Sequence, residues 1–153
     1  MSEANIHASC VALGGKGVLL LGPSGAGKSD LALRLIDQGA KLVADDRTIL
    51  FTLKGALHAR APASIKGLIE IRGIGIVQLP VRTRVRIALV VRLGREGARL
   101  PKPGSYRPPG AVKATALPPQ IALDARFAST PAKIRAALAA FSQGLFQSSF
   151  VTK

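Results

Sequence analysis

The segment GPSGAGKS at residues 22–29 limits the possible folds more than any other part of the sequence. Its glycines, lysine and serine match the pattern GxxxxGK[ST], and it stands between an apolar run, Gly17–Leu21, and a helical pattern from about Lys28 to Gln38. Glycines let successive backbone N–H groups surround a phosphate, and the helix N-terminus adds partial positive charge. We therefore expect this strand, loop and helix to bind a nucleoside triphosphate or another polyphosphate. The alternative is a chance glycine-rich turn that only caps a helix.

The pattern also assigns roles within the loop. The residues expected to surround the phosphates are Gly22, Pro23, Ser24, Gly25, Ala26, Gly27, Lys28 and Ser29. The Lys28 ammonium would reach the β- and γ-phosphates, and the Ser29 hydroxyl is a suitable ligand for Mg²⁺. ATP and Mg²⁺ are therefore the expected cofactors.

Two adjacent acids follow the apolar stretch Lys41–Ala44, which reads as a strand. The chain has only 8 acidic residues, so the pair Asp45 and Asp46 stands out. Ligands of open α/β sheets bind at the carboxyl ends of the strands. One carboxylate could hold the metal, and the other could accept the proton of an attacking hydroxyl. The residues alone leave the division of roles open, and they also allow a simple turn or helix-capping pair.

Two further residues are candidates for the same site. Glu70 lies in the apolar segment LIEIRGIGIVQL, where an isolated carboxylate must face solvent, an arginine or a metal. The glycines Gly73 and Gly75 just beyond it indicate a close approach of the backbone to something else. A surface ion pair between Glu70 and Arg72 is the alternative. His7 could face the phosphate site if the first strands run beside it, although a lone histidine in a short strand is more often structural.

The charge of the chain is strongly positive, with 22 Lys and Arg against 8 Asp and Glu, or +14. Nine of the basic residues lie between Arg82 and Lys113, with Glu96 as the single acid among them. Such a surface would attract nucleic acid, an acidic protein or a phosphorylated substrate. The alternative is an edge strand of the sheet, on which the arginines are solvated and prevent pairing with another chain. With one Tyr, five Phe and no Trp, the chain is poorly supplied for stacking on single-stranded nucleic acid.

The remaining pattern predicts one α/β domain over residues 1–153, with 142–153 as a flexible tail. Expected strands are 6–13 and 17–21 joined at Gly14-Gly15, 41–44, 48–53 and 56–60 joined at Lys54-Gly55, and 81–93 with one apolar face. Residues 102–119 should be irregular, and a helix should start at Thr130-Pro131. The strand, loop, helix and strand order at the start predicts an α/β unit with parallel strands. No apolar run approaches the ~20 residues of a membrane span, no secretory signal is evident and there is one cysteine, so we expect a cytoplasmic protein without membrane partners.

Three motifs together carry a resemblance to a known family. GPSGAGKS, LVADDR and LIEIRGIGIVQL, in this order and spacing, closely resemble the catalytic domain of bifunctional HPr kinase/phosphorylase, which phosphorylates a serine of the phosphocarrier protein HPr. The similarity covers roughly residues 6–101, and a weaker similarity extends to residue 141. It implies an α/β fold built on a phosphate-loop-containing mixed twisted sheet with few flanking helices, like HPr kinase and PEP carboxykinase. It also suggests the short form that lacks the additional N-terminal domain.

The resemblance implies roles for individual residues. It makes Lys28 a catalytic lysine and Ser29 a magnesium ligand, Asp46 the proton acceptor with Asp45 beside it as a further metal ligand, and Glu70 the metal-binding glutamate. The family's early histidine corresponds to His7. Its later catalytic arginine corresponds best to Arg99, with Arg92 as the second choice.

The resemblance further implies a serine kinase that acts on an HPr-type carrier and forms a homo-oligomer, a hexamer. The family's Arg- and Gly-containing loop for the dephosphorylating direction has no clean match, because this chain has LPPQIALDAR there. Phosphorolysis of phosphoserine is therefore an open expectation. Two rival interpretations are a nucleotide-dependent nucleic-acid-binding protein and a small-molecule kinase. Neither of these functions requires the segment LIEIRGIGI.

Overall fold

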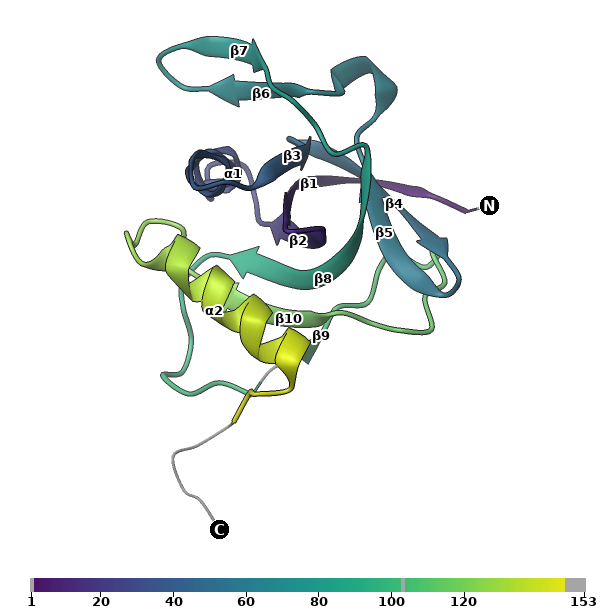
Figure 1. The fold of residues 1–153 in the computed structure, drawn as a ribbon, viewed down its shortest axis with the longest axis vertical. Coiled ribbons are helices and arrows are strands. Elements are labelled where there is room, and N and C mark those ends of the chain that lie inside the picture. Colours follow the sequence, from purple (N-terminus) through teal and green to yellow (C-terminus); the bar gives the residue numbers. More distant parts are fainter. Residues whose placement is uncertain (1, 103, 148–153) are drawn as a thin grey trace.

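The computed structural model describes residues 2–102 and 104–147, which are organised around one curled eight-stranded sheet (Figure 1). The strands are ordered β2-β1-β4-β5-β8-β10-β9, β3 lies beside β1, and an additional β2–β8 pairing makes the sheet curl. Two α-helices and a separate two-stranded hairpin complete the fold. The expected mixed α/β class with few helices is confirmed. The elements are β1 (Ala4–Leu13), β2 (Lys16–Leu21), α1 (Lys28–Asp37), β3 (Lys41–Ala44), β4 (Arg47–Leu53), β5 (Ala56–Arg60), a 3₁₀ turn (Ala63–Ile65), β6 (Leu68–Ile71), β7 (Gly75–Gln78), β8 (Arg84–Leu93), β9 (Gly104–Ser105), β10 (Pro119–Leu123) and α2 (Thr130–Gln143).

Two tight turns form where the sequence places them. Gly14 and Gly15 join β1 to β2 with φ angles of 55° and 82°, and Lys54 and Gly55 join β4 to β5 with φ angles of 51° and 79°. Positive φ at both central residues matches the right-handed twist of the strands, which is why such two-residue turns favour glycine. The predicted hairpins are therefore confirmed.

The strands on either side of the phosphate loop and α1 are parallel, as predicted, but they do not pair with each other. β1 pairs antiparallel with β2 along one side and with β3 along the other. β2 and β3 thus run in the same direction, but β1 lies between them. The tight turn folds β2 directly back on β1, which leaves the opposite edge of β1 for β3. The parallel pairs of the sheet are instead β2–β8 and β8–β10.

β8 is a central strand, and a bulge divides it into two halves. Gly17 of β2 is opposite Ile87 while the next residue, Val18, is opposite Leu89, so that Ala88 is the extra residue. Ahead of the bulge Val85 and Ile87 face one core, and beyond it Leu89, Val91 and Leu93 face another. The prediction of a single apolar face from 81 to 93 is therefore wrong, because the bulge reverses the alternation.

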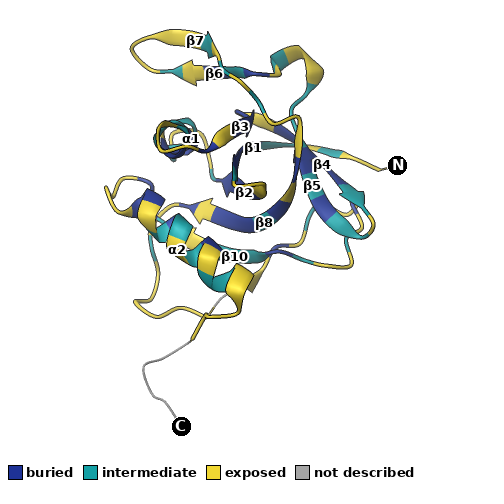
Figure 2. Cartoon of the chain, in the orientation of Figure 1, coloured by how far each residue is buried: buried dark blue, intermediate teal, exposed yellow. Residues whose placement is uncertain are grey.

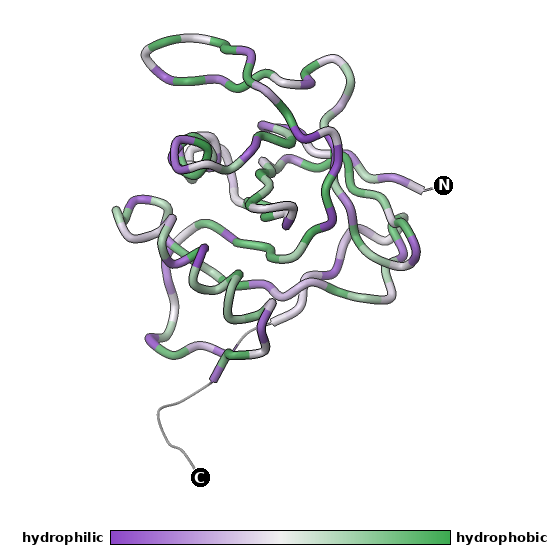
Figure 3. The backbone as a smooth tube through the Cα atoms, viewed as in Figure 1, coloured by the Kyte–Doolittle hydropathy of each residue, from purple (hydrophilic) through white to green (hydrophobic). Residues whose placement is uncertain are grey.

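The protein has two apolar cores. One lies between the sheet and the two helices, where Leu31 and Leu35 of α1 and Ile134 and Leu138 of α2 are buried. The other fills the inside of the curl and includes Leu19, Leu50 and Leu57. Figure 2 shows the buried stretches in β1, β2 and β8, and Figure 3 shows that the same stretches are hydrophobic. The helices are thus held by packing. α1 ends one residue before the expected end, and α2 begins at Thr130 as expected.

Several elements were not predicted. β6 and β7 form a hairpin that stands away from the sheet (Figure 1), and it leaves Ile74 and Ile76 exposed. Gly73 and Gly75 have positive φ, and a Cβ added at either residue would meet no atom within 4 Å, so they serve the turn and do not mark a close approach. β9 and β10 lie in or next to the segment expected to be irregular.

The end of the chain is only partly described. Ser142 and Gln143 form the end of α2, and Gly144 caps it with a φ of 67°. The rest of the predicted flexible tail includes residues 148–153, which lie outside the described residues. Among the helices that the structure describes, none is long and apolar enough to cross a membrane.

Candidate functional site

The glycine-rich segment forms an open loop between β2 and α1. Gly22, Gly25 and Gly27 have φ angles of 156°, 86° and 95°, which other residues adopt only with strain. At Gly22 a side chain would also meet Ala26 Cβ at 2.9 Å. The local sequence therefore folds into this loop because glycine stands at each of these positions, and α1 begins directly after it.

Lys28 folds back over the loop. Its side chain is buried, and its Nζ donates hydrogen bonds to the carbonyl oxygens of Gly22 at 2.6 Å and Pro23 at 3.1 Å. Burial lowers the pKa of Lys28, while the nearby carboxylates of Asp46 and Asp45 act to raise it. The ammonium is therefore held between the loop and the two acids.

Asp45 is the buried centre of the site. Its Oδ1 accepts hydrogen bonds from Ser29 Oγ at 2.6 Å and from Ser9 Oγ at 2.9 Å, and its Oδ2 accepts one from the backbone N–H of Glu70 at 3.3 Å. The donors come from α1, β1 and β6. This one carboxylate thus joins the loop to the hairpin, and its hydrogen bonds satisfy a charge that would be costly to bury alone.

Asp46 has a different environment. Its side chain is 68% exposed, and its Oδ1 lies 2.9 Å from Nε2 of His7. Its backbone has a φ of 69°, and its N–H donates to Ser9 Oγ at 3.2 Å. The turn therefore buries one carboxylate and presents the other to solvent next to an imidazole. The predicted proximity of His7, Lys28, Asp45 and Asp46 is found, because the antiparallel β1 carries His7 and Ser9 past the end of β3.

The other predicted residues are less closely associated. The backbone of Glu70 contacts Asp45, but its side chain is exposed and, among the described residues, has no hydrogen bond or ion pair. Within residues 2–102 and 104–147, no three His, Cys, Asp or Glu side chains are grouped as a metal site. Arg99 is exposed in the segment after β8. Arg92 of β8 is near Tyr106: burial raises the pKa of Tyr106, and the positive charge of Arg92 partly offsets this rise. In the described chain neither arginine bonds to the loop or to the aspartates.

Sequence reasoning missed Ser9. It is fully buried in β1, and its hydroxyl bonds to both aspartates through Asp45 Oδ1 and the N–H of Asp46. A serine inside the apolar run of a predicted strand was the available signal, because a buried hydroxyl needs a partner.

A second missed cluster lies beside the loop. A pocket of about 390 Å³ has Gly25, Ala26, Gly27, Asp30 and Arg34 on one side and Ala125, Arg126 and Ala128 on the other. Arg126 Nη2 lies 2.7 Å from Asp124 Oδ2, and this contact lowers the pKa of Asp124 to about 2. The segment LPPQIALDAR thus forms β10 and then a charged turn next to the phosphate loop.

Comparison with known proteins identifies the family. Residues 1–98 match the family model described as HPr Serine kinase C-terminal domain. The chain belongs to this family. All three motifs lie inside the match, and Arg99 falls just beyond it. The resemblance inferred from the motifs is therefore confirmed.

Individual relatives agree with this assignment. The chain is 43% identical over 90 residues to the HPr kinase/phosphorylase of Leptothrix cholodnii, in a match of 54% of this chain and 28% of that protein. It is 41% identical over 78 residues to the enzyme of the same name from Clostridium acetobutylicum, covering 51% of this chain and 26% of that one. The matches thus span only about a quarter of these relatives. The structure of the Hpr(Ser) kinase/phosphatase from Coxiella burnetii superimposes with a TM-score of 0.76 and 25% identity, covering 93% of this chain and 92% of that one.

Proposed function

We propose that the protein is an ATP- and Mg²⁺-dependent serine kinase that phosphorylates an HPr-type phosphocarrier protein. The observation that carries this proposal is the joining of the loop to the acids, with Ser29 Oγ 2.6 Å from Asp45 Oδ1 and the exposed Asp46 beside them. Membership of the HPr serine kinase C-terminal domain family supports it. The names of the relatives supply the type of substrate.

The loop Gly22–Ser29 would hold the β-phosphate through its backbone N–H groups and the N-terminus of α1. Lys28 already lies over the loop, where its Nζ bonds to two loop carbonyls. On nucleotide binding it would exchange these carbonyls for phosphate oxygens. Its charge would then stabilise the negative charge that moves toward the leaving phosphate during transfer.

The residues present fit a magnesium ion that arrives with the nucleotide. Mg²⁺ is usually held by one or two carboxylates together with substrate phosphates and water, so a cage made only of protein ligands is not required. Ser29 Oγ and Asp45 Oδ1 supply adjacent oxygens, and Glu70, whose backbone N–H bonds to Asp45, is the proposed source of a second carboxylate. When bound, the ion would neutralise charge on the β- and γ-phosphates.

Asp46 is the proposed proton acceptor because its carboxylate is exposed beside the loop. As the serine hydroxyl of the substrate attacks, its oxygen forms a bond to the γ-phosphorus, the bond from that phosphorus to the β-bridging oxygen breaks, and ADP leaves. The hydroxyl proton passes to Asp46. His7, at 2.9 Å, orients this carboxylate. Arg99, or in second place Arg92, is the proposed arginine for the transferring group.

The reverse reaction and the assembly belong to the same proposal. Asp46 would act as the acid if inorganic phosphate attacks phosphoserine. We further propose a homo-oligomer, a hexamer by resemblance, that works in the cytoplasm. The exposed Ile74 and Ile76 of the β6–β7 hairpin support burial of this hairpin in an assembly.

The test is incubation with γ-labelled ATP, Mg²⁺ and a panel of HPr-type carriers, followed by mapping of the labelled residue. We expect label on a carrier serine, and Asp46→Asn should bind nucleotide normally while losing about 10²-fold or more in transfer. Asp37→Asn is the matched control, since Asp37 is an exposed residue at the end of α1. Transfer to a small molecule, or full transfer by Asp46→Asn, would contradict the proposal.

A further inference from the structure

One face of the sheet gathers basic side chains from four neighbouring strands. Residues that are directly opposite in neighbouring strands share a face, so the register defines it. Ile49 of β4 is opposite Arg60 of β5, which is opposite Arg84 of β8. The rows on either side belong to the same face, because alternate residues of a strand point the same way. We call this set the arginine face: Asn5, His7, Arg47, Ile49, Phe51, His58, Arg60, Arg84 and Arg86.

Protection of a sheet edge does not account for the whole face. β5 pairs with both β4 and β8, so His58 and Arg60 project from an interior strand, whereas Arg84 and Arg86 lie in the part of β8 that pairs with β5 alone. Like charges directly opposite each other destabilise a sheet, and Arg60 is opposite Arg84. The arrangement therefore costs stability and calls for another explanation.

The positive charge of the arginine face is only partly neutralised by acidic residues of the chain. Glu3 pairs with Arg60 at 2.6 Å, but Arg84 and Arg86 have no acidic partner in the part of the chain that the structure describes. The second terminal nitrogen of Arg60, Nη1, is buried without a hydrogen-bond partner in that same part. A surface with this surplus attracts an acidic counterpart at long range.

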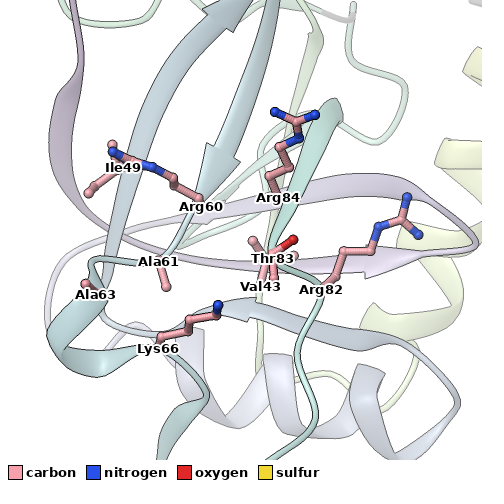
Figure 4. Close-up of a pocket in the computed structure, with 9 residues that line it drawn as sticks. All are labelled: Val43, Ile49, Arg60, Ala61, Ala63, Lys66, Arg82, Thr83 and Arg84. Carbon is pink, nitrogen blue, oxygen red and sulfur yellow. The ribbon is translucent and has the colours of Figure 1, made fainter.

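The shape of the arginine face indicates what kind of partner it can bind. A pocket of about 400 Å³ has Val43, Ile49 and Ala61 in its lining, together with Arg60, Lys66, Arg82 and Arg84 (Figure 4). In Figure 4 Lys66 reaches toward the middle of the pocket, whereas Arg82 and Arg84 extend away from it. A second pocket, of about 720 Å³, shares Arg84. Basic groups that spread around apolar hollows suit an extended acidic surface with apolar side chains, and they do not converge on one small anion.

We propose that the arginine face is the surface on which the protein substrate docks, through an acidic patch around an apolar side chain. This inference rests on the proposed kinase function. The face leads to the phosphoryl-transfer site, because Arg47 follows Asp46 directly and is opposite His7, which contacts Asp46. A protein bound here lies next to the exposed carboxylate. Nucleic acid fits less well, since Phe51 is buried and covered by Arg60 and is therefore not open for stacking with bases.

The test is the double variant R84E/R86E, assayed with HPr-type carriers at increasing concentration. We expect KM for the carrier to rise about tenfold or more and to lose most of its salt dependence, with kcat at saturation and the affinity for ATP unchanged. The control is K102E/R107E, which changes the net charge equally at two exposed residues near β9. R84Q/R86Q tests the same point without added acids, and melting temperatures of all variants show that they are folded.

The outcomes separate this inference from the kinase proposal. If the wild-type protein labels no carrier, the proposed function fails. If the wild type is active and R84E/R86E keeps its KM while folded, or if K102E/R107E raises KM equally, the docking surface is wrong. Binding of DNA or RNA that is steeply salt-dependent and lost in R84E/R86E, without a change in KM, would likewise overturn it in favour of a nucleic-acid surface.

Discussion

The hydroxyl of Ser9 supports both acids of the site, and its removal gives the sharpest test of the geometry. In Ser9→Ala the buried Asp45 loses one of its three donors, and the N–H of Asp46 loses its acceptor. A hydrogen bond to a charged group contributes about 1.5–3 kcal/mol, and an unsatisfied N–H costs about 1 kcal/mol where water can partly reach it. We expect the free energy of unfolding to fall by about 2–4 kcal/mol.

The assay is urea unfolding, with thermal unfolding as a second measure. A loss of about 3 kcal/mol corresponds to a melting temperature lower by about 6–12 °C in a chain of this size. Ser129→Ala is the matched control because Ser129 is exposed and its side chain makes no capping hydrogen bond, so it should stay within about 0.5 kcal/mol. In a double-mutant cycle with Asp45→Asn, we expect a coupling energy of about 1 kcal/mol or more. A loss in Ser9→Ala no larger than that of the control would refute the reasoning.

Three further results are expected. Lys28→Ala should abolish measurable ATP binding in calorimetry, and binding at wild-type affinity would count against the phosphate loop. Gly17→Ala should destabilise the fold by about 1–3 kcal/mol, because a Cβ there lies 2.7 Å from the backbone oxygen of Arg86 in a central strand; an unchanged melting temperature would argue against the β2–β8 pairing. The contact with Arg126 lowers the pKa of Asp124 from 3.8 to about 2, so its contribution to stability is present above pH 4 and is lost as the pH falls from about 4 to 2. Urea unfolding should show the wild type and Asp124→Asn converging over that range, and a constant difference would contradict the ion pair.

Local chemistry explains which parts of the fold were predictable. The turns at Gly14-Gly15 and Lys54-Gly55 and the loop at 22–29 depend on residues that tolerate positive φ, and they are visible in the sequence. The bulge at Ala88 is not visible, since it arises from fitting β8 to β2 and is marked only by the register of that pair. Likewise β3 takes its place beside β1 because that edge is free, which is a property of the whole sheet.

The candidate site likewise has parts that could be predicted from the sequence and parts that could not. The phosphate loop and the acid pair are contiguous motifs, and their proximity follows from placing both at the carboxyl ends of β2 and β3. Ser9 could not be assigned, because its role depends on β1 running antiparallel past the end of β3. The arginine face could not be assigned either, since its residues come from four strands that only the register of the sheet brings together.

The central claim is that the loop and the two aspartates form one phosphoryl-transfer site. A crystal structure with a non-hydrolysable ATP analogue and Mg²⁺ tests it directly. The account predicts the terminal phosphate in the Gly22–Ser29 loop, with the Asp46 carboxylate within a hydrogen bond or one bridging water of the attacking position. An analogue bound elsewhere, or an Asp46 carboxylate directed away from its terminal phosphate, would contradict the account.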